Sequence, residues 1–116
     1  MTPMEHEHPR ALRLSLSDAL MSTPPPGNLA SEMATLDFAD VEFYQPHGID
    51  AQKPHRRDEL YIIAGGSGVL RAGNEEFRFG PGDVLFVAAN VEHRFTEFTD
   101  DFATWVIFYG AEKESA

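Results

Sequence analysis

Residues 59–98 read ELYIIAGGSGVLRAGNEEFRFGPGDVLFVAANVEHRFTEF, and this stretch decides the fold class. Short runs rich in Val, Ile, Leu and Phe alternate with Gly, Pro, Asn and Asp, which is typical of strands joined by tight turns. Residues 72–75, AGNE, are a hairpin signal, because Gly and Asn tolerate the positive φ of such turns. Phe77 and Phe79 alternate with Arg78, which predicts one face toward a core and one toward solvent.

The same pattern continues on both sides of this stretch and predicts seven strands. They are Asp40–Tyr44, Glu59–Ile63, Gly68–Arg71, Glu75–Phe79, Val84–Val87, His93–Phe98 and Thr104–Tyr109. Many short strands with almost no helix indicate an all-β sandwich or barrel. The nearly continuous apolar run Trp105–Tyr109 is expected of a strand that is covered on both faces or lies at a subunit contact.

The chain before the first of these strands has a different composition. Residues 12–20 are amphipathic with helical spacing and with a possible cap at Ser15 or Ser17, and the sequence PPPG at 24–27 breaks any helix. We therefore interpret residues 1–33 as an N-terminal arm that contains at most a short helix. Residues 34–111 form the β domain and 112–116 a C-terminal tail.

Length and charge narrow the classes of function. The chain has 116 residues, which is enough for one domain, and its 19 acidic and 9 basic residues give a net charge of −10. This charge disfavours binding to nucleic acid or to anionic membranes. The sequence has no apolar stretch of about 20 residues that could cross a membrane, so we expect a cytoplasmic protein. Because there is no cysteine, any metal site must use His, Asp, Glu or Gln.

Three residues could form such a site if the strands bring them together. His55 and Glu59 flank the start of one predicted strand, and His93 opens a later one. Two imidazoles and one carboxylate suit Fe(II), Mn(II), Ni(II) or Zn(II) with positions left open for a ligand. On spacing alone there is an alternative interpretation. In it, His55 is a solvated loop residue, Glu59 pairs with an arginine, and His93 caps the end of a strand.

The two remaining places with histidine are weaker candidates. His6 and His8 have the spacing of a metal motif, but they lie in the polar arm, where no strand would hold them rigid. His47 precedes Gly48 in a segment that reads as a surface loop.

Two stretches resemble the sequence motifs of the cupin family, G-x5-H-x-H-x3,4-E-x6-G and G-x5-P-x-G-x2-H-x3-N. Residues 48–66 are similar to the first motif, with His55 and Glu59 at ligand positions, and residues 82–97 are similar to the second, with His93 in place of its histidine. The likeness extends over about residues 40–110. It implies an all-β jelly-roll barrel of the cupin type with one divalent metal ion held by His55, Glu59 and His93.

The resemblance is incomplete at the first histidine of motif one. With three residues before the glutamate, Lys53 occupies that place, and with four residues Gln52 and Pro54 occupy both histidine places. We expect Gln52 to be the fourth ligand, since an amide oxygen can bind a hard cation, whereas an inward Lys53 would repel it. In motif two, the proline, glycine and asparagine are replaced by Ala88, Asn90 and Glu97.

The resemblance implies a homodimer that acts on a small molecule. The reaction types to expect are those of a dioxygenase, an isomerase or a lyase, and the alternatives are a non-enzymatic binding module or a sensor module. Candidate substrate-binding residues are Arg57, Tyr61 and Phe95; Arg57 could instead offset the acidic surface, and the two aromatic residues could belong to the core. An exposed edge formed by Trp105–Tyr109 would give dimerisation a physical motive.

Overall fold

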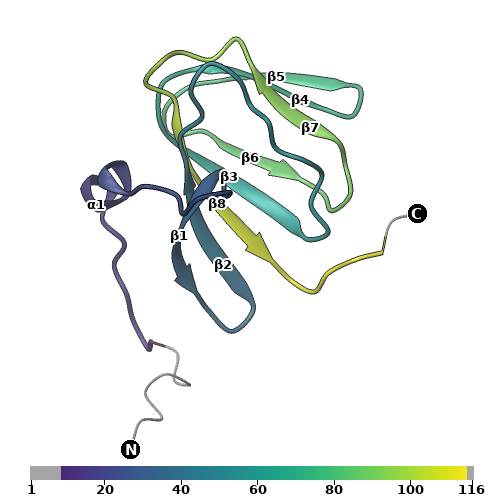
Figure 1. Ribbon diagram of the computed structural model, residues 1–116. Coiled ribbons are helices and arrows are strands. Elements are labelled where there is room, and N and C mark those ends of the chain that lie inside the picture. Colours follow the sequence, from purple (N-terminus) through teal and green to yellow (C-terminus); the bar gives the residue numbers. More distant parts are fainter. Residues whose placement is uncertain (1–8, 115–116) are drawn as a thin grey trace, which may run out of the picture.

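The computed structural model describes residues 9–114, in which two β-sheets face each other (Figure 1). It has one short helix, α1 (Leu16–Met21), and eight strands. The strands are β1 (Ala30–Thr35), β2 (Ala39–Tyr44), β3 (Asp58–Gly65), β4 (Gly68–Ala72), β5 (Glu75–Phe79), β6 (Val84–Val87), β7 (His93–Thr96) and β8 (Ala103–Tyr109). The seven predicted strands are all present, with ends that differ by at most two residues. The all-β class is therefore confirmed.

The larger sheet has the order β1-β2-β8-β3-β6 and the smaller one the order β5-β4-β7, and every pair of neighbours is antiparallel. The expected jelly roll is present as a sandwich of these two sheets. The expected closed barrel is not, because the strand ladders of the described residues leave the two sheets separate. The crossings from one sheet to the other are made by loops.

The core lies between the two inner faces and is rich in aromatic rings. Phe95, at 1% exposure, is at its centre, with ring centroids 4.9 Å from Tyr61, 5.5 Å from Phe79 and 4.8 Å from Phe102. Such tilted and edge-to-face pairs add about 0.5–1.5 kcal/mol each to the stability given by burial. Phe95 is therefore a core residue, and the expectation that it binds substrate is corrected.

One glycine is required where β3 turns into β4. Gly66 has a φ of 76°, and a Cβ at this position would lie 2.5 Å from the Cα of Phe102. Any other residue would push this core phenylalanine away, so the Gly-rich turn at 65–68 serves the close approach of two backbones.

The N-terminal arm is more ordered than the sequence predicts. Ser15 caps α1 by accepting a hydrogen bond of 3.0 Å from the Asp18 N–H, as one of the two predicted caps would. Strand β1 was not predicted, because its sequence ASEMAT is poor in β-branched and aromatic residues and its pairing with β2 is irregular between Glu32 and Ala34. Tertiary pairing, rather than local propensity, makes this segment a strand.

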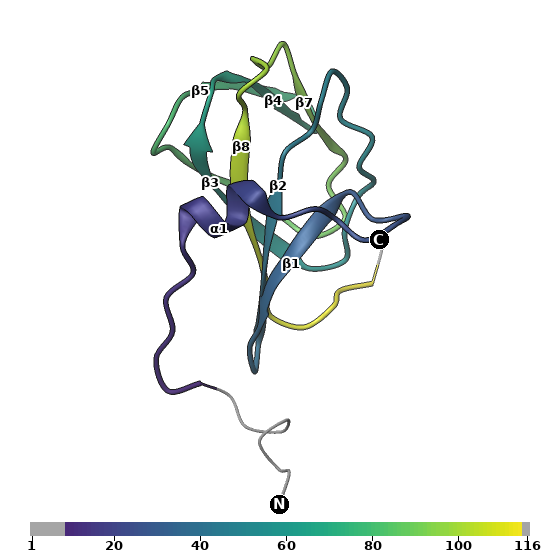
Figure 2. The same ribbon diagram turned by 60° about the vertical axis from the view of Figure 1, so that its left-hand side comes forward.

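The apolar run Trp105–Tyr109 is in β8, which lies between β2 and β3 in the middle of the larger sheet. It is thus not an exposed edge. The sequence-based argument that this run would drive dimerisation is therefore wrong. Helix α1 crosses the outer face of this sheet (Figure 2), where Ala19 packs with Phe43 and Ala103. Within residues 9–114, no helix has the length and apolar character that a membrane crossing needs.

Candidate metal centre

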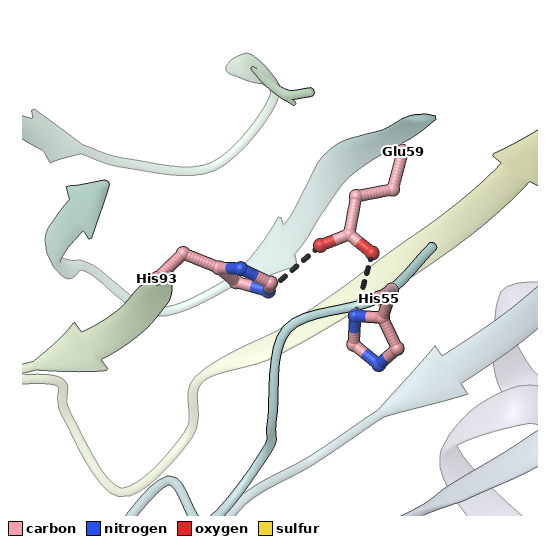
Figure 3. Close-up of side chains that lie close together, drawn as sticks. All are labelled: His55, Glu59 and His93. Atoms are coloured by element: carbon pink, nitrogen blue, oxygen red, sulfur yellow. Dashed lines mark ion pairs between the residues drawn. The ribbon is translucent and has the colours of Figure 1, made fainter. Parts of the chain in front are cut away.

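The two sheets bring His55, Glu59 and His93 together between them (Figure 3). Glu59 is on β3 of the larger sheet, His93 opens β7 of the smaller sheet, and His55 lies in the loop before β3. Glu59 Oε1 is 2.8 Å from His93 Nε2, and Glu59 Oε2 is 3.0 Å from His55 Nδ1. One ligand atom from each residue lies within 4.8 Å of the others, so a single ion could contact all three.

The orientation of these atoms fits a metal better than it fits hydrogen bonds. His55 Nδ1, Glu59 Oε2 and His93 Nε2 are buried, and despite the short distances none has a partner with hydrogen-bond geometry. His93 Nδ1 lies 2.9 Å from the Val91 carbonyl oxygen, which can only accept, so Nδ1 carries the proton and Nε2 of the neutral ring presents a lone pair. A lone pair that faces a carboxylate is stable only with a cation between them, and a metal ion supplies one.

The carboxylate of Glu59 is anionic in these surroundings. Burial by itself would raise its pKa, but the neighbouring His55 and His93 and the hydrogen bond from Tyr61 lower that pKa to about 2. Burial by itself would lower the pKa of His93. The interaction with Glu59 raises this pKa by more, so the pKa of His93 is above its usual value. The site therefore attracts positive charge, whether a proton or a metal ion.

A hydrogen-bond network behind the ligands fixes their orientation. The Tyr61 hydroxyl donates to Glu59 Oε1 at 2.6 Å and lies 3.2 Å from Gln52 Oε1, and Gln52 Nε2 donates to Asp50 at 2.8 Å. Asp50, at 1% exposure, also accepts from the Tyr44 hydroxyl, from the Gln52 N–H and from the Phe95 N–H. Asp50 thus connects the core to the site through Gln52 and Tyr61.

A cavity of about 420 Å³ opens beside the three ligands, and we call it the His55 pocket. Its lining comes from β1, β2, β8, the segment before β1 and the loop between β2 and β3: Gly27, Asn28, Leu29, Ala30, Glu32, Glu42, Tyr44, Gln52, His55, Val106 and Phe108. The side chain of His55 is 34% exposed, whereas those of Glu59 and His93 are each 1% exposed. A small molecule in this pocket would therefore reach the centre from the side of His55.

The other predicted site residues have different positions. Tyr61 is fully buried and contacts Glu59, so it positions a ligand and does not line the pocket. Arg57 lies elsewhere, because its guanidinium donates to Asp40 and to the carbonyl oxygens of Phe38 and Gly110. Its predicted role in substrate binding is replaced by a structural one that joins β2 to the end of β8.

The remaining basic candidates take no part in the centre. Lys53 is exposed, so its ammonium does not oppose an ion, and His47 is exposed on its loop as the sequence predicts. His6 and His8 lie outside the described residues.

Sequence reasoning missed two glutamates of the pocket and the buried Asp50. The alternation in residues 39–44, ADVEFY, places Glu42 on the same face as Tyr44, and this signal was available. Glu32 could not be placed without β1, its strand. Asp50 is in a loop, where no periodicity marks burial.

A family model described as the cupin domain matches residues 41–109. The chain belongs to the cupin family. An uncharacterised protein of Streptomyces coelicolor is 36% identical in an alignment 92 positions long that covers 69% of this chain and 88% of that protein.

Solved cupin structures agree with this assignment. A protein of Shewanella frigidimarina with a cupin-2 domain superposes with a TM-score of 0.65 at 14% identity, over 84% of this chain and 94% of its own. A structure described as a DMSP lyase superposes with a TM-score of 0.53 at 26% identity, over 64% of this chain and 38% of its own. Cupins commonly bind a metal ion, and in this cupin His55, Glu59 and His93 form a group that could hold one.

Proposed function

We propose that this cupin binds one divalent transition-metal ion, Fe, Mn, Ni or Zn, through His55, Glu59 and His93. The observation that carries the proposal is the set of three buried ligand atoms that converge without hydrogen-bond geometry. We propose Gln52 as the fourth ligand, because its amide oxygen and Glu59 both lie next to the Tyr61 hydroxyl. The combination of nitrogen and oxygen ligands suits these metals.

We further propose that the His55 pocket holds a small organic substrate. The ion would act there as a Lewis acid, which suits an isomerase or a lyase, and a redox-active ion such as Fe or Mn would also suit a dioxygenase. The chain itself would supply the fixed ligands: the Val91 carbonyl sets the tautomer of His93, and the Tyr61 hydroxyl fixes one oxygen of Glu59. The likeness to a DMSP lyase supports the lyase class among these. The cytoplasmic location stays a prediction from the sequence.

Metal analysis tests the first part of this proposal. Protein without a tag, stripped with a chelator and then dialysed against each of the four ions, is expected to retain about one ion per chain of at least one metal. Elemental analysis by mass spectrometry measures the ratio. Retention of none of the four metals would refute the metal centre.

A non-enzymatic binding or sensor module is the second candidate function. The observation that favours it is that, among residues 9–114, only three histidine and glutamate side chains converge here, since fewer ligands hold a metal more weakly. Iron or manganese that stays bound through purification would support an enzyme. A pocket that binds small molecules equally well with and without metal would support the binding module.

We also propose that this cupin is a homodimer through the outer face of its larger sheet. Strand β6 is at the edge of that sheet, and its Val84 and Phe86 are 61% and 53% exposed. Phe86 continues a cross-strand row formed by Leu60, Ile107 and Val41. An apolar row that ends at an open edge is suited to pair with the same row of a second copy.

Phe86→Lys is expected to convert the dimer to a monomer, because it places a charge in the centre of that contact. Size-exclusion chromatography with light scattering measures the mass. Phe38→Lys is the matched control, since Phe38 is 75% exposed in the β1–β2 turn and is not part of this cross-strand row. A monomeric wild-type protein, or an unchanged dimer in Phe86→Lys, would contradict this surface.

A further inference from the structure

Besides His55, the wall of the His55 pocket carries two carboxylates that lie on neighbouring strands. Glu32 on β1 and Glu42 on β2 are direct cross-strand partners, and both line the pocket. Like charges at directly opposite positions are destabilising. The proposed metal centre does not use either residue, so their juxtaposition calls for another explanation.

Glu42 makes no direct polar contact within residues 9–114. Glu32 accepts a hydrogen bond of 2.7 Å from the Thr35 hydroxyl, whereas Glu42 has neither a hydrogen bond nor an ion pair with any residue in 9–114. Burial, followed by the charge of Glu32, raises the pKa of Glu42, and His55 offsets this rise only in part, so a further cation beside Glu42 would stabilise its ionised form. No lysine or arginine is among the residues that line the pocket.

The rest of the lining is apolar and aromatic. Leu29, Val106 and Phe108 form this part of the wall, and the Phe108 ring packs edge-on against His55 with centroids 4.8 Å apart. An aromatic ring beside carboxylates is a favourable environment for a positively charged nitrogen on a hydrocarbon body. An anionic or purely polar molecule would gain nothing from this combination.

We propose that the His55 pocket binds a small organic cation, an alkylammonium group whose nitrogen lies between Glu32 and Glu42 and whose apolar body contacts Leu29, Val106 and Phe108. The proposal rests on the proposed function insofar as the body of this ligand extends toward the metal centre at His55. It adds the chemical class of the ligand, a cationic nitrogen compound, to that function.

A titration with three probes of equal length tests this class. n-Hexylammonium, n-hexanol and n-hexanoate are added at pH 7 to isotope-labelled protein, metal-free and metal-loaded, and NMR shifts of the pocket amides are followed. We expect hexylammonium to bind saturably and at least about tenfold more tightly than hexanol, as a charge-assisted hydrogen bond would give. Hexanoate is expected not to bind to the metal-free protein.

Variants of Glu32 and Glu42 test whether these two carboxylates bind the ammonium group. Glu42→Gln keeps the shape of the side chain and is expected to weaken hexylammonium binding about tenfold, and Glu32→Gln added to it should weaken binding further. Glu75→Gln is the matched control, because Glu75 is an exposed carboxylate on the smaller sheet and its loss should leave the affinity unchanged.

Equal affinity for hexanol and hexylammonium would overturn the proposal, as would an unchanged affinity in the double glutamine variant or the absence of saturable binding. Metal content is measured on the same samples. Cation binding without metal binding would refute only the proposed metal centre, and metal binding without cation selectivity would refute only this inference.

Discussion

Protein with His93→Ala is expected to purify without metal and to take up none on reconstitution. His93 contributes its Nε2 from the smaller sheet, and without it only His55 and Glu59 remain of the three converging residues. Because changes even to residues behind the ligands reduce metal affinity 10- to 100-fold, loss of a ligand should exceed about 100-fold. Elemental analysis and competition with a chelator measure the effect.

The control for this experiment is His47→Ala. His47 is exposed on its loop, so the variant removes an imidazole but no proposed ligand, and its metal content should equal that of the wild type. Circular dichroism on both variants separates loss of a ligand from loss of the fold. A folded His93→Ala protein with unchanged metal content would disprove the assignment.

The largest loss of stability is expected from Asp50→Ala. The two oxygens of Asp50 accept hydrogen bonds from the Tyr44 hydroxyl, the Gln52 side chain and the backbone N–H groups of Gln52 and Phe95. Removal of the carboxylate leaves these buried donors unsatisfied, which should lower the free energy of unfolding by about 3–5 kcal/mol. Denaturant unfolding of the metal-free protein measures this difference.

Asp100→Ala is the matched control, because Asp100 is exposed, and a change of less than about 0.5 kcal/mol is expected there. Asp50→Ala should also weaken metal binding, since Gln52 and, through it, Tyr61 lose their support. A loss of stability below about 1 kcal/mol would show that Asp50 is not the centre of this network.

The sequence was sufficient for seven of the eight described strands, because alternation and turn residues report local structure directly. Glu75–Phe79 and Val84–Val87 were predicted to the residue, and Glu59 was expected to lie near His55 and His93. Strand β1 could not be predicted, because its residues have low β propensity and its register with β2 is irregular, although the two strands are neighbours in the sequence. The same limit hid the partnership of Glu32 with Glu42.

The sequence also does not determine in which direction a side chain points, as Arg57 and Phe95 show. Arg57 is close to Glu59 along the chain, yet it points to Asp40 and the end of β8, because a carboxylate and two carbonyl oxygens there accept hydrogen bonds from its guanidinium. Phe95 was a reasonable pocket residue by type, but only the three-dimensional packing shows that other rings surround it.

The two buried ligands come from opposite layers of the sandwich, Glu59 from the larger sheet and His93 from the smaller. An ion bound by both would act as a cross-link between layers that no backbone ladder joins. Its binding energy would then add to the cohesion of the entire domain, because the layers could not separate without releasing it. Cellular metal supply would in this way govern how long the folded protein survives as well as its chemistry.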